Sequence, residues 1–119
     1  MLKNRLIYTI TIVYTLAIIA LSFMNLRELP ELKTGFDDKI FHCIAYALFC
    51  LLWYLCFEAL KIKSSLIFAI VFSIVFGGLI EILQSKLSSY RTTEFFDLLA
   101  NTLGVLLMAI GIRLKKRYN

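Results

Sequence analysis

The sequence predicts an all-α polytopic membrane protein, a four-transmembrane-helix bundle, and two features of the chain lead to that prediction. Hydrophobic residues make up 61% of its 119 residues and its mean hydropathy is +0.83, whereas soluble domains contain about 45 to 50% apolar residues. A soluble chain this short could enclose only one small core and would expose large apolar patches. The apolar residues also gather in four runs, each near the roughly 20 residues that cross a bilayer.

The four apolar runs cover residues 6–24, 40–60, 65–84 and 94–113. Each is expected to be a helix, because backbone polar groups in lipid must be bonded within their own segment and the alternation of barrel strands is absent. The first run follows Lys3 and Arg5. Its roughly 19 residues exceed the 7 to 15 of a signal-peptide core, so we expect a retained helix. We find no repeat and expect one membrane domain over residues 1–119.

Three polar connections separate the runs. The first, residues 25–39, contains Pro30, Gly35 and charges of both signs, which break a helix and suit an interfacial segment. The second, residues 58–64, is a short basic turn, and the third, residues 85–93, is rich in serine and threonine. These hydroxyl residues are good helix caps.

The formal net charge of +5 is distributed in a way that predicts topology. The chain ends and the second connection contain eight basic residues: Lys3, Arg5, Lys61, Lys63, Arg113, Lys115, Lys116 and Arg117. The other side has five: Arg27, Lys33, Lys39, Lys86 and Arg91. The positive-inside rule therefore places both chain ends in the cytoplasm. Nucleic acid is not an expected partner, because that would need a basic face interleaved with aromatic residues.

Three cysteines, Cys43, Cys50 and Cys56, fall in the second apolar run. Seven helical residues separate the first two by about 10 Å, and a disulfide needs Cα atoms within about 7 Å. We therefore expect packing residues and no disulfide among them.

Polar residues inside the apolar runs are the candidates for function, because an ionised side chain at a helix centre costs roughly 2.5 to 3.5 kcal/mol on insertion. The second run begins with Asp38, Lys39, His42 and Tyr46. Positions 38, 42 and 46 share one helix face. Asp38 could alternatively only cap the helix.

The third and fourth runs have matching polar sets. The third ends with Gly77, Gly78, Glu81 and Gln84, in which the glycines allow close helix approach. Arg91 precedes the fourth run, which then presents polar and small residues at spacings of three and four: Glu94, Asp97, Asn101, Gly104, Met108 and Gly111. This spacing predicts one seam along the helix. Interhelical bonding that only fixes packing is the alternative.

The depth of these residues predicts a common pocket. At 1.5 Å per residue, His42, Glu81 and Asp97 should each lie about 5 Å inside one end of their helices. Tyr46 and Asn101 should lie about 10 to 12 Å deep, as a hydrogen-bonding floor. The sequence therefore predicts a polar pocket that opens away from the cytoplasm.

No established catalytic motif is present. A GxSxG element, an HExxH element and a phosphate loop are all missing from the sequence. His42, with Asp38, Glu81 and Asp97, could in principle hold a divalent ion, but these residues come from separate segments without a compact metal motif. We expect no metal and no other cofactor.

At these residues the chain resembles the VanZ-like family of small bacterial membrane proteins. The matching elements are Asp38-Lys39-x-x-His42-x-x-x-Tyr46, Glu81-Ile-Leu-Gln84, and Arg91 followed by Asp97-Leu-Leu-Ala-Asn101-Thr-Leu-Gly104. Family members often have a Pro-Gly turn before the arginine, where Ser88-Ser89-Tyr90 stands here. The resemblance implies the bacterial cytoplasmic membrane and a cell-envelope role, and the family takes its name from a protein linked to teicoplanin resistance.

The favoured hypothesis is that the pocket recognises the headgroup of a membrane lipid or of a lipid-linked cell-wall intermediate. Arg91 and Lys39 would engage phosphate or carboxylate. A membrane-embedded enzyme could use the same pocket, with His42 or Glu81 as general base. A structural or partner-binding module without ligand is the third alternative.

Overall fold

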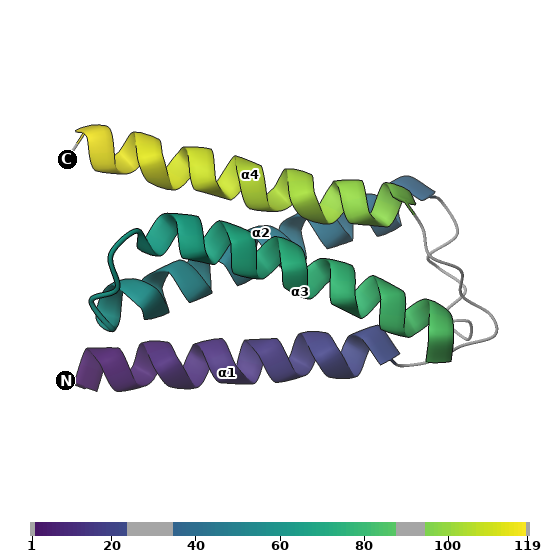
Figure 1. Cartoon of the computed structure of the whole chain (residues 1–119), viewed down its shortest axis with the longest axis horizontal. Coiled ribbons are helices and arrows are strands. Elements are labelled where there is room, and N and C mark those ends of the chain that lie inside the picture. The colour runs from purple at the N-terminus through teal and green to yellow at the C-terminus, as the bar shows by residue number, and fades with distance from the viewer. Residues whose placement is uncertain (1, 24–34, 88–94, 119) are drawn as a thin grey trace.

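A computed structural model describes residues 2–23, 35–87 and 95–118 of the chain, with side chains over 2–22, 40–83 and 98–117. Four helices account for nearly all of this part: α1 (Leu2–Phe23), α2 (Gly35–Ala59), α3 (Ser65–Leu87) and α4 (Phe95–Tyr118). Within the described ranges there is no strand (Figure 1). The prediction of an all-α, four-helix bundle is confirmed.

Each helix is long and apolar enough to cross a membrane. The candidate spans are Leu2–Ser22, Ile40–Ala59, Ser65–Leu83 and Leu98–Arg117. The helices contain 22 to 25 residues, which corresponds to about 33 to 38 Å against about 30 Å of hydrocarbon. The chain is therefore a multi-pass membrane protein.

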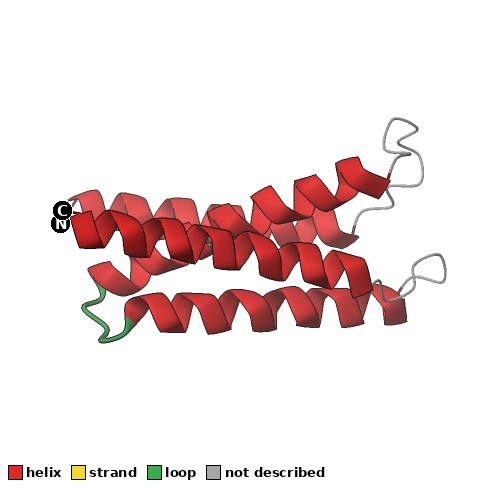
Figure 2. Ribbon diagram, turned by 90° about the horizontal axis from the view of Figure 1, so that it is seen from above, coloured by secondary structure: helices red, strands yellow, loops and turns green. Residues whose placement is uncertain are grey.

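The helices run alternately up and down. Both termini and the turn between α2 and α3 lie at one end of the bundle (Figures 1 and 2). α2 contacts the three other helices, α4 contacts α2 and α3, and α1 contacts α2 and α3. α3 also contacts all three of the others. Among the described residues α1 does not contact α4, so α2 and α3 lie between α1 and α4.

Aromatic rings fill the contact between α2 and α3. Phe49 is fully buried, and its ring stacks on Phe76 at 4.6 Å and on Phe72 at 5.9 Å between centroids. Trp53 meets Phe72 edge-on at 4.7 Å. Such pairs contribute about 0.5 to 1.5 kcal/mol each beyond the burial of their area.

Polar side chains attach α1 to α2. The Tyr14 hydroxyl donates a hydrogen bond to the Ala45 carbonyl oxygen at 2.6 Å, and Trp53 Nε1 donates to Thr15 Oγ1 at 3.1 Å. Lipid supplies no hydrophobic drive for helices to associate, so interhelical hydrogen bonds of this kind matter for docking.

Several helices are longer than their apolar runs. α2 already begins at Gly35, in a segment expected to be part of the first connection, and α4 continues to Tyr118 through the basic C-terminal sequence. Acidic residues near a helix start and basic residues near its end interact favourably with the helix dipole. Lys115, Lys116 and Arg117 occupy the last turn of α4.

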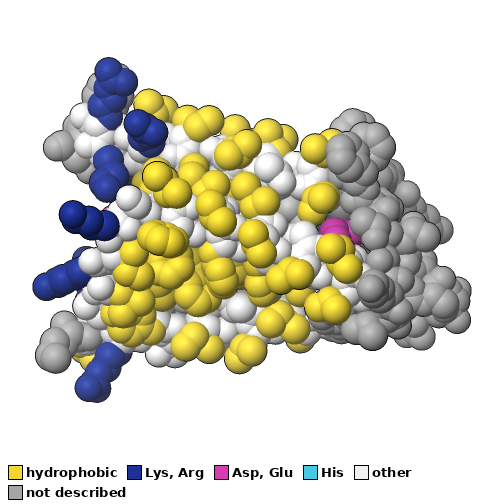
Figure 3. Space-filling view, in the orientation of Figure 1, with side chains coloured by type: hydrophobic (Ala, Val, Ile, Leu, Met, Phe, Trp, Pro, Cys, Tyr) yellow, Lys and Arg dark blue, Asp and Glu magenta, His cyan; other side chains and the backbone are white. Residues whose placement is uncertain are grey.

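Basic side chains gather at the end that contains both termini, called here the basic end. Figure 3 shows this cluster beside a broad hydrophobic band. Its members are the eight basic residues expected on the cytoplasmic side, and all of them are exposed: Lys3, Arg5, Lys61, Lys63, Arg113, Lys115, Lys116 and Arg117. The three cysteines are free, and Cys50 and Cys56 are buried.

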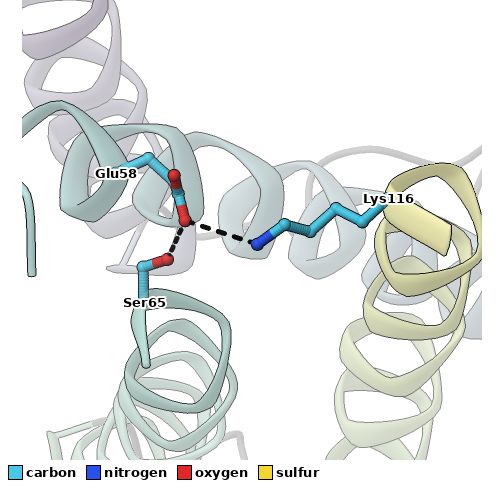
Figure 4. Close-up of polar contacts among 3 residues, drawn as sticks. All are labelled: Glu58, Ser65 and Lys116. Carbon is cyan, nitrogen blue, oxygen red and sulfur yellow. Dashed lines mark hydrogen bonds and ion pairs between the residues drawn. The ribbon is translucent and has the colours of Figure 1, made fainter. Parts of the chain in front are cut away.

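One acidic side chain joins three helices at the basic end. Glu58, near the end of α2, accepts a hydrogen bond from the Ser65 hydroxyl at the start of α3 (Figure 4). Lys116 Nζ of α4 lies 3.8 Å from the same Glu58 oxygen and 5.8 Å from the centre of the Tyr54 ring. Exposed ion pairs are worth about 0 to 1 kcal/mol, so this contact contributes little to stability by itself.

Candidate functional site

Three helices meet at a polar contact in the half of the bundle remote from the basic end. Gly77 of α3 leaves room for Tyr46 of α2 and Asn101 of α4. A Cβ atom added at Gly77 would lie 3.2 Å from Asn101 Nδ2 and 3.3 Å from Tyr46 Cε1. Tyr46 and Asn101 are 5% and 3% exposed. The two residues expected at the floor of the pocket are thus neighbours across a glycine.

The next turn toward the remote end contains further polar residues. His42 precedes Tyr46 by four residues and Glu81 follows Gly77 by four, so each lies on the same helix face about 6 Å farther along its helix. Glu81 is only 4% exposed, and it lies close enough to Tyr46 to interact with it electrostatically. His42 is half-buried. A carboxyl group buried among apolar spans is a candidate for function.

His42 and Glu81 lie farther from the ends of their helices than the sequence suggested. Because α2 begins at Gly35 and α3 ends at Leu87, His42 and Glu81 are about 9 to 10 Å from those ends, beyond the expected 5 Å. The extra helical turns increase the distances of His42 and Glu81 from the ends of α2 and α3. They do not alter the contact between Tyr46, Gly77 and Asn101.

Five of the predicted site residues cannot be located at the level of their side chains. The backbone of Asp38, Lys39, Gln84 and Asp97 lies in described helices, but their side chains lie outside the described part of the structure. Arg91 lies outside the described residues altogether. Their role in a site stays a prediction.

A closer helix contact than the sequence suggested involves Gly104, one turn beyond Asn101 along α4. A Cβ atom at Gly104 of α4 would lie 2.1 Å from the carbonyl oxygen of Cys43 in α2. The small-residue seam of α4 included Gly104, but nothing in the sequence identified Cys43 as its partner. The same seam included Gly111, which is exposed and has no other atom of the described residues within 4 Å of its Cβ position. α2 and α4 therefore approach most closely near Gly104 and are not equally close along the whole seam.

The fold and this cluster define a small multi-pass membrane protein with buried polar residues in the half of its bundle remote from the basic end. Residues 5–116 match the model of the VanZ/LLP1 family, and the chain belongs to that family. An uncharacterised protein of Schizosaccharomyces pombe is similar, with 36% identity over 90 residues, 74% of this chain and 54% of the relative. The chain thus spans about half the length of the curated relative that it matches. No solved structure matches the chain.

Proposed function

We propose that this protein binds the headgroup of a membrane lipid in the half of the bundle remote from the basic end. Arg91 and Lys39 engage the phosphate, the first through its bidentate guanidinium and the second as a point charge. The remaining polar groups of the ligand are oriented by His42, Glu81, Asp97 and Asn101. The lining of the proposed site is completed by Asp38, Tyr46 and Gln84.

The observation that supports this proposal is the meeting of Tyr46, Gly77 and Asn101 from three helices, with the buried Glu81 one turn farther along α3. Burying polar groups in lipid-spanning helices costs free energy unless they gain partners. A packing role would be served by one interhelical hydrogen bond. A layer that combines an acid, an amide, a phenol and an imidazole is better suited to a polar ligand.

The setting that we propose is a cytoplasmic membrane, with both termini in the cytoplasm and the site on the opposite face, because the basic residues favour that orientation. A relative of this chain occurs in a yeast, so a membrane lipid is favoured as ligand over a lipid-linked cell-wall intermediate. A contribution to glycopeptide resistance would rest on family membership alone.

The test uses conservative changes at the two charged residues that are expected to act most directly. Arg91→Lys keeps the charge but loses the bidentate fork, and Asp97→Asn keeps the shape but loses the anion. Each should lower the amount of phospholipid that co-purifies with the protein roughly tenfold. Ser88→Ala, in the same connection as Arg91, is the matched control and should retain the parental amount.

Membrane abundance and melting temperature are measured on the same samples. Both should be unchanged, because a polar residue near the end of a span can still reach water. If lipid retention persists in both variants, the proposal is wrong. If stability and expression decline in step with lipid retention, the layer is a packing element.

A further inference from the structure

The amide of Asn101 has an unusual environment. Its side chain is 3% exposed, yet Oδ1 is fully buried and accepts no hydrogen bond from any residue that the structure describes. A buried acceptor without a partner costs about 1 to 3 kcal/mol. Asn101 differs in this respect from Glu81, which already has an interaction partner.

The geometry brings a second acceptor toward Asn101. Side chains on a helix lean toward its N-terminus. α3 and α4 are antiparallel (Figure 1), so Glu81 leans toward the level of Gly77, whereas Asn101, which contacts Gly77, leans toward the level of Glu81. The rise between positions 77 and 81 is about 6 Å. Two N–H···O bonds of about 2.8 Å from one tetrahedral nitrogen atom join acceptors about 4.6 Å apart, and the opposite leans of the two side chains shorten the axial offset of about 6 Å toward that value.

Asn101 Oδ1 and the Glu81 carboxylate are both acceptors. Asn101 Oδ1 is an amide oxygen, and an ionised glutamate has two oxygens that accept several hydrogen bonds at once. A phosphate or a second carboxylate would meet the like charge of an ionised Glu81. A cation with several N–H groups matches both acceptors and the charge of Glu81.

Building on the proposed lipid-binding function, we propose that the headgroup ends in a primary ammonium, which donates hydrogen bonds to Asn101 Oδ1 and to the Glu81 carboxylate. The ligand class is therefore a zwitterionic aminophospholipid of the phosphatidylethanolamine type. The phosphate of this lipid contacts the basic residues of the proposed site. The affinity of the lipid depends on the number of N–H donors in its ammonium group.

The experiment uses a methylation series that changes donors at constant charge. The full-length protein in detergent is titrated with dioleoyl phosphatidylethanolamine, its N-methyl and N,N-dimethyl derivatives, and dioleoyl phosphatidylcholine, and bound lipid is counted by native mass spectrometry. These lipids present three, two, one and no N–H groups. We expect affinity to fall along the series, by roughly tenfold in total. Dioleoyl phosphatidylglycerol, which has hydroxyl donors but no cation, should bind no better than phosphatidylcholine.

Two substitutions assign the effect to Asn101. Asn101→Leu removes the acceptor at similar volume and should abolish the preference for phosphatidylethanolamine. Asn101→Asp keeps two acceptor oxygens and should preserve that preference, which shows that a loss in the leucine variant is not a general folding defect. Thr102→Val is the matched control, because the Thr102 hydroxyl donates to its own helix at Leu98 O, 2.9 Å away, and it should behave like the parent.

The outcomes separate this inference from the proposed function. If all four lipids of the series bind the parent equally, or if phosphatidylglycerol binds best, the ammonium assignment is wrong while headgroup binding stands. A preference that survives in Asn101→Leu also overturns it. If no phospholipid binds, the proposed function itself fails.

Discussion

Gly104 is a residue at which the fold tolerates little change. Its Cβ position lies 2.1 Å from the Cys43 carbonyl oxygen, 2.8 Å from the carbonyl carbon and 3.0 Å from Cys43 Cα. All three atoms belong to the backbone of α2, so no side-chain rotation can relieve the overlap. Small residues at helix interfaces in membranes allow such close backbone approach.

Gly104→Ala should therefore separate α2 from α4 and destabilise the protein by about 3 kcal/mol or more, the upper range of overpacking in a core. Gly111→Ala is the matched control on the same helix, since nothing described lies within 4 Å of its Cβ position. It should be neutral or gain up to about 1 kcal/mol from helix propensity. Unfolding free energies in mixed micelles measure both. Equal effects of the two changes would contradict the close contact at Gly104.

At the scale of an element, the end of α2 has a well-defined cap. The Lys61 N–H donates to Glu58 O at 3.0 Å and the Ile62 N–H donates to Phe57 O at 3.0 Å. These two bonds form a Schellman motif, in which the residue after the cap adopts a left-handed conformation. That residue is Lys61, with φ of 59°. The sequence indicated a short basic turn here, but without a glycine it did not indicate a left-handed residue.

Lys61→Gly should stabilise the protein by about 0.5 to 1 kcal/mol, because glycine adopts a positive φ without the steric cost of a Cβ atom. Lys63→Gly removes the same charge from the same turn at a residue without a positive φ. It should give no gain, since glycine adds freedom to the unfolded chain. Melting temperatures in one detergent compare the two. A larger gain for Lys63→Gly would argue against the cap.

At the scale of the whole molecule, the distribution of charge predicts how the bundle is inserted. The eight basic side chains at the basic end (Figure 3) include those of the turn between α2 and α3. The positive-inside rule therefore predicts that this end lies in the cytoplasm.

Cysteine labelling of intact cells with an impermeant reagent tests the orientation. On a background in which Cys43, Cys50 and Cys56 are replaced, Lys33→Cys and Lys86→Cys should be modified and Lys61→Cys should be spared. Lys61 is exposed in the structure, so its protection would result from the membrane and not from burial. Cell lysis should then make Lys61→Cys reactive. The reverse pattern in intact cells would show that the bundle is inserted the other way.

The number and place of the helices could be determined from the sequence by itself. A membrane span is a local property, because about 20 apolar residues are sufficient to cross the hydrocarbon. The polar positions His42, Glu81 and Asn101 were also visible, since each interrupts an apolar run. Family membership rests on the same residues and their order.

Only the tertiary structure decided how those helices meet. The helices are apolar on most sides, so the pattern of hydrophobic residues does not orient one against another. The crossing angle of two helices depends on side-chain shapes from distant segments, and for that reason Gly104 is in close contact with α2 while Gly111 is exposed. The buried Asn101 oxygen, which has no hydrogen-bond partner among the described residues, could not be foreseen either, because hydrogen bonding in the core is decided by the neighbours that three separate helices bring together.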